Sequence, residues 1–93
     1  MRFKRGTYRL RLAPECERPF SNILKRFASL NLPSGDFLDG LNKIRDDVQM
    51  GNAPPGTKTR RSRPGLFFLP VNSHHVAFRV DEVGGLVVIE DLR

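Results

Sequence analysis

The spacing of the apolar residues changes twice along this chain: from every second residue, to every third or fourth, and back to every second. Residues 7–13 alternate between apolar and polar side chains. A period of two predicts a strand with one buried face. Arg9 and Arg11 fall on the other face. We expect them to mark the outside of an edge strand, since charge there deters aggregation.

Two helices are predicted by the stretches that follow. The first lies behind Pro14 and Pro19, residues that suit a first helical turn. The second lies between Ser34, a good N-cap, and Gly51, which suits the position just after a helix. Their apolar stripes are Phe20, Ile23, Leu24, Phe27 and Leu30, and then Phe37, Leu38, Leu41, Ile44 and Val48. The short connection between the stripes predicts an antiparallel helix hairpin.

The second half of the chain predicts three more strands. Residues 52–65 carry no apolar stripe and are expected to form an extended connection. Strand-like runs then occupy 66–71, 75–80 and 86–91, and the short turns between them predict an antiparallel meander. Pro70 cannot donate a backbone hydrogen bond, so its strand should lie at an edge or carry a bulge.

These elements predict a single α+β domain over residues 1–93, in the order β-α-α-β-β-β. A sheet with one apolar face needs a cover, and the helix hairpin provides it. The expected architecture therefore has two layers, with the hairpin packed on a four-stranded, mainly antiparallel sheet. A chain of 93 residues is short enough for one small core.

Positive charge gathers in two short blocks of the chain. There are 16 Lys and Arg against 10 Asp and Glu, for a net charge of +6. One block lies in residues 2–11, and the other is "TKTRRSRPG" at 57–65. The basic residues of the second block are Lys58, Arg60, Arg61 and Arg63. Blocks of one sign attract nucleic acids or acidic proteins. A solvated loop whose charge serves solubility is the alternative for 57–65, and both interpretations stay open.

Several features predict a cytoplasmic protein that does not meet a membrane. Cys16 is the single cysteine, so an internal disulfide is impossible. No apolar run approaches the roughly 18 residues of a transmembrane helix. The basic residues 2–5 lead into an alternating stretch instead of the apolar segment of a signal peptide.

Two segments of the chain, together with its size and element order, resemble the RelE/ParE superfamily of bacterial toxins from toxin–antitoxin pairs. "YRLRLAPECERPF" at 8–20 is similar to the family's opening strand, and "GLFFLPVNSHHVAFRVDEVGGLVVIEDLR" at 65–93 is similar to its closing meander. The resemblance implies one of two activities. RelE-like members are metal-independent endoribonucleases, most of which cut mRNA in the ribosomal A site. ParE-like members inhibit DNA gyrase, and members of both kinds are neutralised by an antitoxin.

The RelE-like activity implies a set of phosphate ligands in this chain. Metal-free cleavage uses the RNA 2′-hydroxyl as nucleophile, and it needs cations around the phosphate where charge develops. By resemblance, the basic residues just before the second strand would bind phosphate, with a further arginine on the third strand. These are Lys58, Arg60, Arg61 and Arg63, and then Arg79. Arginine suits this task because its guanidinium binds phosphate in a bidentate manner.

The proton transfers of the same reaction imply a titratable group near the phosphate. The Tyr-Arg pair that opens the family's third strand falls here at His74 and His75. A histidine titrates near neutral pH, so His75, or its neighbour His74, is the candidate for proton transfer. No metal or cofactor is expected, because adjacent histidines in a strand diverge and no further ligand lies at a recognisable spacing.

Two departures from the family pattern leave a second function open. The arginine usual within the second strand falls at Pro70, and no Tyr or His follows the meander. Both departures favour a non-catalytic ParE-like toxin or a degenerate nucleic-acid-binding member. The histidine pair and the basic block favour the endonuclease, to which we give a small preference.

Each interpretation has its own partners. A RelE-like protein would meet the ribosome and mRNA, and a ParE-like protein would meet DNA gyrase. Either toxin would have a cognate antitoxin, expected to be acidic and to cover residues 57–65. A nucleic-acid-binding domain unrelated to toxins is a third, plainer interpretation.

Overall fold

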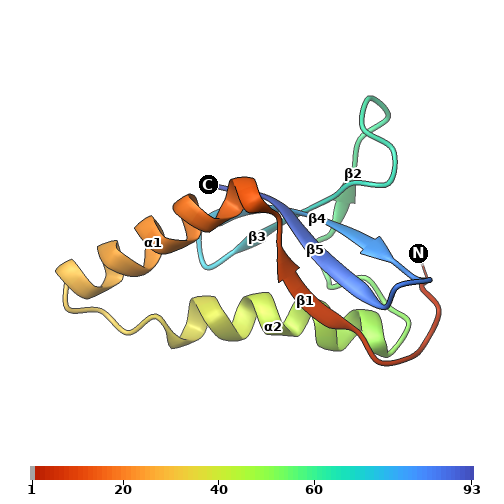
Figure 1. Ribbon diagram of the computed structural model, residues 1–93, viewed down its shortest axis with the longest axis horizontal. Helices are drawn as coiled ribbons and strands as arrows, with labels where there is room; N and C mark the ends of the chain where they lie inside the picture. The colour runs from red at the N-terminus through yellow and green to blue at the C-terminus, as the bar shows by residue number, and fades with distance from the viewer. Residues whose placement is uncertain (1) are drawn as a thin grey trace.

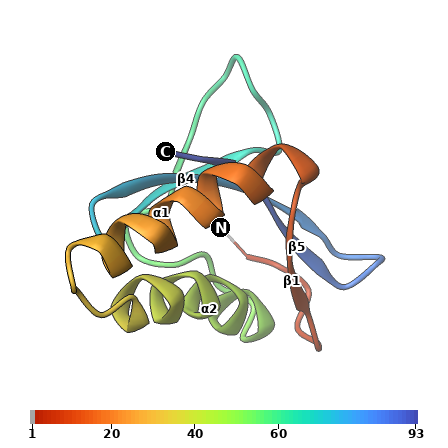
Figure 2. The same ribbon diagram turned by 60° about the vertical axis from the view of Figure 1, so that its left-hand side comes forward.

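The computed structural model describes residues 2–93 and has two helices and one sheet (Figure 1). Its elements are β1 (Arg9–Leu12), a 3-10 turn η1 (Pro14–Cys16), α1 (Glu17–Ser29), α2 (Gly35–Gln49), β2 (Lys58–Thr59), β3 (Phe67–Val71), β4 (His74–Asp81) and β5 (Leu86–Leu92). The predicted α+β class is confirmed, with the helices on one side of an open, mixed sheet (Figure 2).

The prediction of four strands in the order β-α-α-β-β-β is wrong by one strand. The sheet has five strands, in the spatial order β1-β5-β4-β3-β2. The additional strand, β2, lies inside the stretch predicted as a connection, and it pairs antiparallel with β3 through Lys58↔Phe68 and Thr59↔Phe67. A strand of two polar residues has no periodicity to detect. It exists because the chain returns alongside β3.

The first and last strands of the chain are neighbours in the sheet. β1 runs parallel to β5, with Arg9 opposite Leu86 and Leu12 opposite Ile89, while all other pairs are antiparallel. Parallel neighbours need a long crossover, which the helix pair and the meander supply. β1 is an edge strand with Arg9 and Arg11 exposed, as predicted.

The prediction that Pro70 lies on an edge strand is confirmed only for the part of β3 that contains Pro70. β2 covers only Phe67 and Phe68 of β3, so the outer edge of β3 is free of strand pairing at Pro70. A proline is tolerated there because no ladder donor is needed. The bulge lies elsewhere, between β4 and β5.

Helix α2 supplies most of the helical contribution to the core. Its buried residues are Phe37, Leu41, Ile44 and Val48, none more than 3% exposed. The helix lies so close to the sheet that a Cβ on Gly40 would collide with the side chain of Val71. Its predicted ends are confirmed: it begins after Ser34, and Gly51 follows it with a φ of 87°.

Helix α1 is less completely covered than its apolar stripe suggests. It runs antiparallel to α2, and its C-terminal end projects beyond the sheet (Figure 1). Ile23 is its one buried residue, and Leu30 is 61% exposed. No helix within residues 2–93 combines the length and apolarity needed to cross a membrane.

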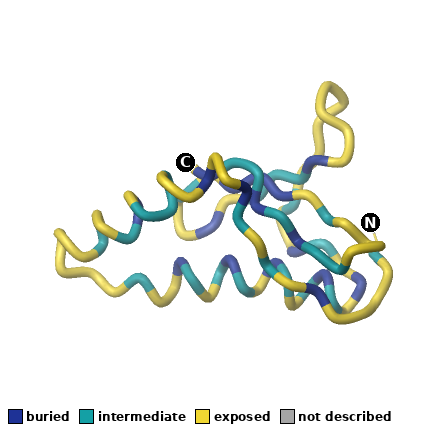
Figure 3. The backbone as a smooth tube through the Cα atoms, in the orientation of Figure 1, coloured by how far each residue is buried: buried dark blue, intermediate teal, exposed yellow. Residues whose placement is uncertain are grey.

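The sheet therefore has two unlike faces. On the covered face, Val76, Phe78, Val87 and Ile89 pack with α2, and each is at most 2% exposed. We call the other side, from which the alternate side chains of each strand project away from the helices, the open face. Burial is concentrated between the sheet and α2, while residues 60–65 of the β2–β3 loop are exposed (Figure 3).

Candidate nucleic-acid interface

The strand register gathers open-face side chains from four strands into two rows. In the first row Lys58, Phe68, Ala77 and Asp91 are successive cross-strand partners. In the second row Pro70 is opposite His75, and His75 exchanges two backbone hydrogen bonds of 2.9 Å with Arg93. Neighbouring strands lie about 4.8 Å apart, so the first row spans about 14 Å.

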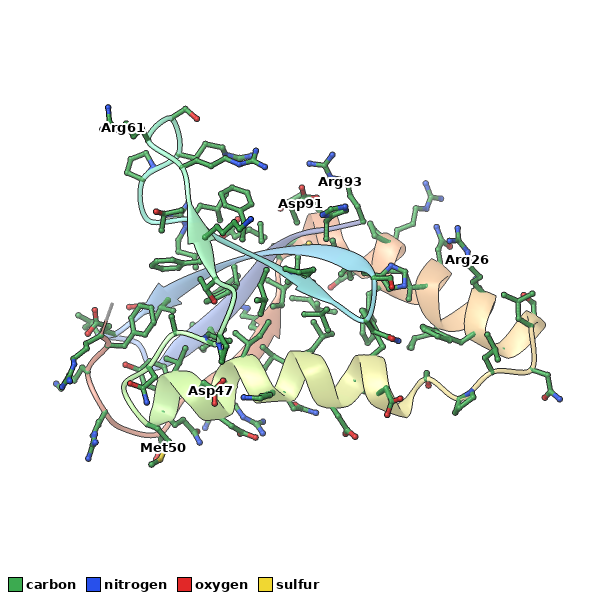
Figure 4. All side chains as sticks on the ribbon, turned by 180° about the vertical axis from the view of Figure 1, so that it is seen from behind. Arg26, Asp47, Met50, Arg61, Asp91 and Arg93 are labelled. Atoms are coloured by element: carbon green, nitrogen blue, oxygen red, sulfur yellow. The ribbon has the colours of Figure 1, made fainter. Side chains whose placement is uncertain are left out.

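The two rows line an open groove of about 610 Å³. Its side chains include Lys58, Arg60, Phe68, Pro70, His75, Ala77, Asp91 and Arg93. In this lining the small side chain of Ala77 lies between its cross-strand partners Phe68 and Asp91. Asp91 and Arg93 stand together at the end of β5, on the side of the sheet away from α2 (Figure 4).

The groove contains two of the four phosphate ligands predicted in the basic block at 57–65. Lys58 lies on β2, and Arg60 follows it with its guanidinium 4.3 Å from the ring centroid of Phe68. Within residues 2–93 neither side chain forms an ion pair with a carboxylate. An exposed cation–π contact contributes only about 0.5–1 kcal/mol, so Arg60 can leave the ring for a stronger ligand at low cost.

The other two predicted ligands, Arg61 and Arg63, lie outside the groove. Both are in the exposed β2–β3 loop, and Arg61 points away from the body of the protein at its tip (Figure 4). The loop holds its shape through hydrogen bonds from the Arg63 amide to the Arg60 carbonyl, 3.2 Å, and from the Leu66 amide to the Arg63 carbonyl, 3.3 Å. The four basic residues are close in sequence, but in space Lys58 and Arg60 line the groove while Arg61 and Arg63 lie apart from it.

The two histidines lie on opposite faces of β4. His75 is exposed and lines the groove. His74 is half-buried on the covered face, with its ring centroid 5.1 Å from Phe37 and 6.2 Å from Phe27. Its Nδ1 lies 3.3 Å from the Arg93 carbonyl oxygen. Of the pair, only His75 is placed to act on something bound in the groove.

Arg79 extends the basic surface beyond the groove and does not line it. It lies on the open face two residues after Ala77, with its Nε 3.7 Å from a carboxylate oxygen of Glu90. Its cross-strand partner is Val88, whose partner on the other side is Arg11. Arg79 and Arg11 therefore lie in one cross-strand row, on either side of Val88.

Asp91, Arg93 and Phe68 are groove residues that sequence reasoning missed. The hairpin turn sets Asp81 opposite Leu86, and counting back from it would place Glu90 opposite Ala77. A bulge shifts the pairing so that Asp91 takes this position instead. The shift brings Arg93 opposite His75 and turns Leu92 to the covered face, where it is 2% exposed.

The two acidic groove neighbours are already paired with arginines. The Asp91 carboxylate lies 3.0 Å from a guanidinium nitrogen of Arg93, as Glu90 lies near Arg79. Asp91 is diagonal to His75 across the β4–β5 pair, a position whose side chains are usually about 7–8 Å apart. The groove thus offers cations, one histidine and one carboxylate to a bound molecule.

Neither a reactive cysteine nor a metal-binding cluster is found at this surface among residues 2–93. The Cys16 thiol is buried, and burial raises its pKa, with Asp91, Glu15 and Glu90 adding to the rise, so it stays protonated at neutral pH. Across residues 2–93, no three or more His, Cys, Asp or Glu side chains come together in a group that could hold a metal ion.

Comparisons of this chain with protein-family models, with curated proteins and with solved structures found no match.

Proposed function

We propose that this protein is a RelE-like toxin that cleaves mRNA on the ribosome without a metal, and that the groove holds the RNA at the cleaved phosphate. One observation carries the proposal. A histidine able to transfer protons, His75, lies in the same groove as Lys58, Arg60 and Arg93. Charge complementarity to a phosphate backbone and a titratable group at neutral pH are what the reaction needs.

The chemistry follows from these roles. His75 accepts the proton of the 2′-hydroxyl, whose oxygen then attacks the neighbouring phosphorus. The bond from phosphorus to the 5′-oxygen breaks, and that oxygen takes a proton from water. The hydroxide that remains takes up the proton held by His75, which restores the starting state. Lys58 and Arg60 stabilise the charge that develops on the phosphate oxygens. The products are a 2′,3′-cyclic phosphate and a 5′-hydroxyl.

The test is translation of a defined mRNA in a bacterial cell-free extract, with new 5′ ends mapped by primer extension. We expect the wild type to create ribosome-dependent ends, and His75→Ala and Lys58→Ala/Arg60→Ala to lose them. Arg61→Ala/Arg63→Ala is the matched control. It removes the same charge from the same segment but outside the groove, and it should retain most of the cleavage.

A protein that neither cuts mRNA nor slows translation in this extract would contradict the endonuclease. A binding-only function, such as ParE-like inhibition of gyrase, is then the second candidate. Its specific support is Pro70, which stands opposite His75 where the resemblance expects an arginine. Inhibition of gyrase supercoiling that survives His75→Ala would support this second candidate.

We also propose a cytoplasmic location and an acidic antitoxin partner that covers residues 57–65. The support for this partner is the exposure of residues 58–65 and the four cations among them, Lys58, Arg60, Arg61 and Arg63. Hydrogen exchange with and without a candidate antitoxin tests this, and unchanged exchange in 57–65 would argue against it.

A further inference from the structure

Phe68 is in an unusual place for a phenylalanine of this protein. The chain has seven phenylalanines, and six of them are buried in the core or packed against it. These six are Phe3, Phe20, Phe27, Phe37, Phe67 and Phe78. Phe68 belongs to neither group and instead lines the groove on the open face. Core packing therefore does not account for an aromatic ring at this position.

The surroundings of Phe68 suit a flat ligand. The guanidinium of Arg60 lies over one face of the ring, 4.3 Å from its centroid. On β4 the cross-strand partner of Phe68 is Ala77, whose small side chain also lines the groove. On β2 the partner is Lys58, an exposed cation. An aromatic surface, a cation and an open space are thus adjacent.

We propose that Phe68 is a stacking platform for one unpaired nucleobase, so that the groove takes single-stranded RNA and not a duplex. This rests on the proposed function, and it names the form of the substrate. The base occupies the ring face now covered by Arg60, and Arg60 moves to the phosphate of the same nucleotide. Stacking of a base on an aromatic ring is worth more than the exposed cation–π contact that it replaces.

The proposal has two consequences for specificity. Bases inside a duplex are already stacked on their neighbours, so they cannot lie on the ring without being unpaired first. Every base has a π-face, so the platform accepts all four, with modest preferences only. Sequence selection, where it occurs, must come from other contacts.

The experiment measures binding without cleavage. A fluorescein-labelled 12-nucleotide RNA with 2′-O-methyl groups throughout has no free 2′-hydroxyl to act as nucleophile, so fluorescence anisotropy reports affinity alone. The same length is prepared as an abasic strand and as a duplex. Wild type is compared with Phe68→Leu, which keeps an apolar side chain without a ring, and with Phe68→Trp, which enlarges the ring. Thermal unfolding of each variant confirms that the fold is kept.

We expect Phe68→Leu to weaken binding of the single strand about ten-fold, the effect of losing one base stack worth about 1.4 kcal/mol. The same variant should bind the abasic strand as the wild type does, and Phe68→Trp should bind the single strand at least as tightly as the wild type. The wild type should bind the single strand more tightly than the duplex.

Two outcomes would overturn the inference, and they differ in what else they remove. If the wild type binds the single strand but Phe68→Leu binds it equally well, or if the abasic strand or the duplex binds the wild type as tightly as the single strand, stacking is wrong while the phosphate groove stands. If the wild type binds none of the three, the nucleic-acid groove and the proposed function both fail.

Discussion

The same residue types occur on both faces of the sheet but in different surroundings. Pairs of neighbouring residues in one strand show this difference. Phe67 packs on the covered face, with ring centroids 5.4 Å from both Phe3 and Phe78. Phe68, the next residue, contacts Arg60 on the open face. His74 and His75 divide in the same way, one among aromatic rings and one in the groove. Successive residues of a strand point to opposite faces, so two residues of the same type can have different surroundings and different roles.

The largest test of this comparison removes one phenylalanine from each face. Phe78→Ala should cost about 3–5 kcal/mol, because it leaves a cavity at a side chain that is 0% exposed. Small domains are stable by only about 5–15 kcal/mol, so much of the protein would unfold. Phe68→Ala should cost about 1 kcal/mol or less. Urea unfolding followed by circular dichroism measures both, and equal losses would show that the open face is also a packing surface.

A second test separates the two histidines. His74→Ala should lower the free energy of unfolding by about 1–2 kcal/mol, since the imidazole lies edge-on to two phenylalanine rings. It should leave RNA binding within two-fold of the wild type. His75→Ala should do the reverse: unchanged unfolding and lost cleavage. The comparison breaks if His74→Ala is the variant that abolishes cleavage while remaining folded.

The pH dependence of stability tests the covered face at its edge. Tyr8 is buried and donates a hydrogen bond of 2.6 Å to the Lys4 carbonyl. Burial raises the pKa of its phenol, and the carboxylates of Glu82 and Asp81 raise it further. A raised pKa means that the neutral phenol stabilises the fold fully below the unfolded pKa of about 10, and that this contribution is lost as the pH rises through the folded pKa.

Tyr8→Phe should therefore cost about 1 kcal/mol at pH 7, from the lost hydrogen bond, and should reduce the fall in stability above about pH 10. Thermal unfolding between pH 7 and pH 11 measures both effects. A variant with the same alkaline fall as the wild type would assign that fall to other groups.

The smallest expected effect concerns the acidic side chain in the groove. Asp91→Asn removes a negative charge beside Arg93 and should tighten RNA binding about two- to five-fold at low salt, with the gain fading as salt is added. Stability should change by less than about 1 kcal/mol, because the ion pair is exposed. Asp47→Asn is the control. Asp47 is paired with Lys43 on α2, on the far side of the sheet (Figure 4). Its loss should leave RNA affinity unchanged.

The elements with many apolar residues in register were predictable from sequence. The apolar stripes from Phe20 to Leu30 and from Phe37 to Val48 predicted the two helices. The alternation in β1 and in the meander predicted four of the five strands. β2 was missed because Lys58 and Thr59 carry no periodic signal. Its pairing depends on the path of the chain after α2, which is a tertiary property.

Some of the groove residues could be predicted from the sequence, and others depend on the tertiary structure. Lys58, Arg60 and His75 stood out by charge and residue type, and the structure brings them together. Arg61 and Arg63 stood out equally and lie apart from them, because the hairpin loop carries them away. Asp91 and Arg93 escaped notice because one bulged position decides which side of β5 they occupy. Strand periodicity cannot reveal a single inserted residue.

The parallel pairing of β1 with β5 has a consequence for how the protein is made. β1 is synthesised before the other elements of the sheet, but the strand with which it pairs is the last of them. Contacts between such distant segments form slowly, and they cannot form at all until β5 has left the ribosome. Asp91 and Arg93, which line the groove, are synthesised at the same late stage. A nascent chain therefore carries its basic segment, its helices and most of its sheet, but not the assembled surface on which the proposed activity depends.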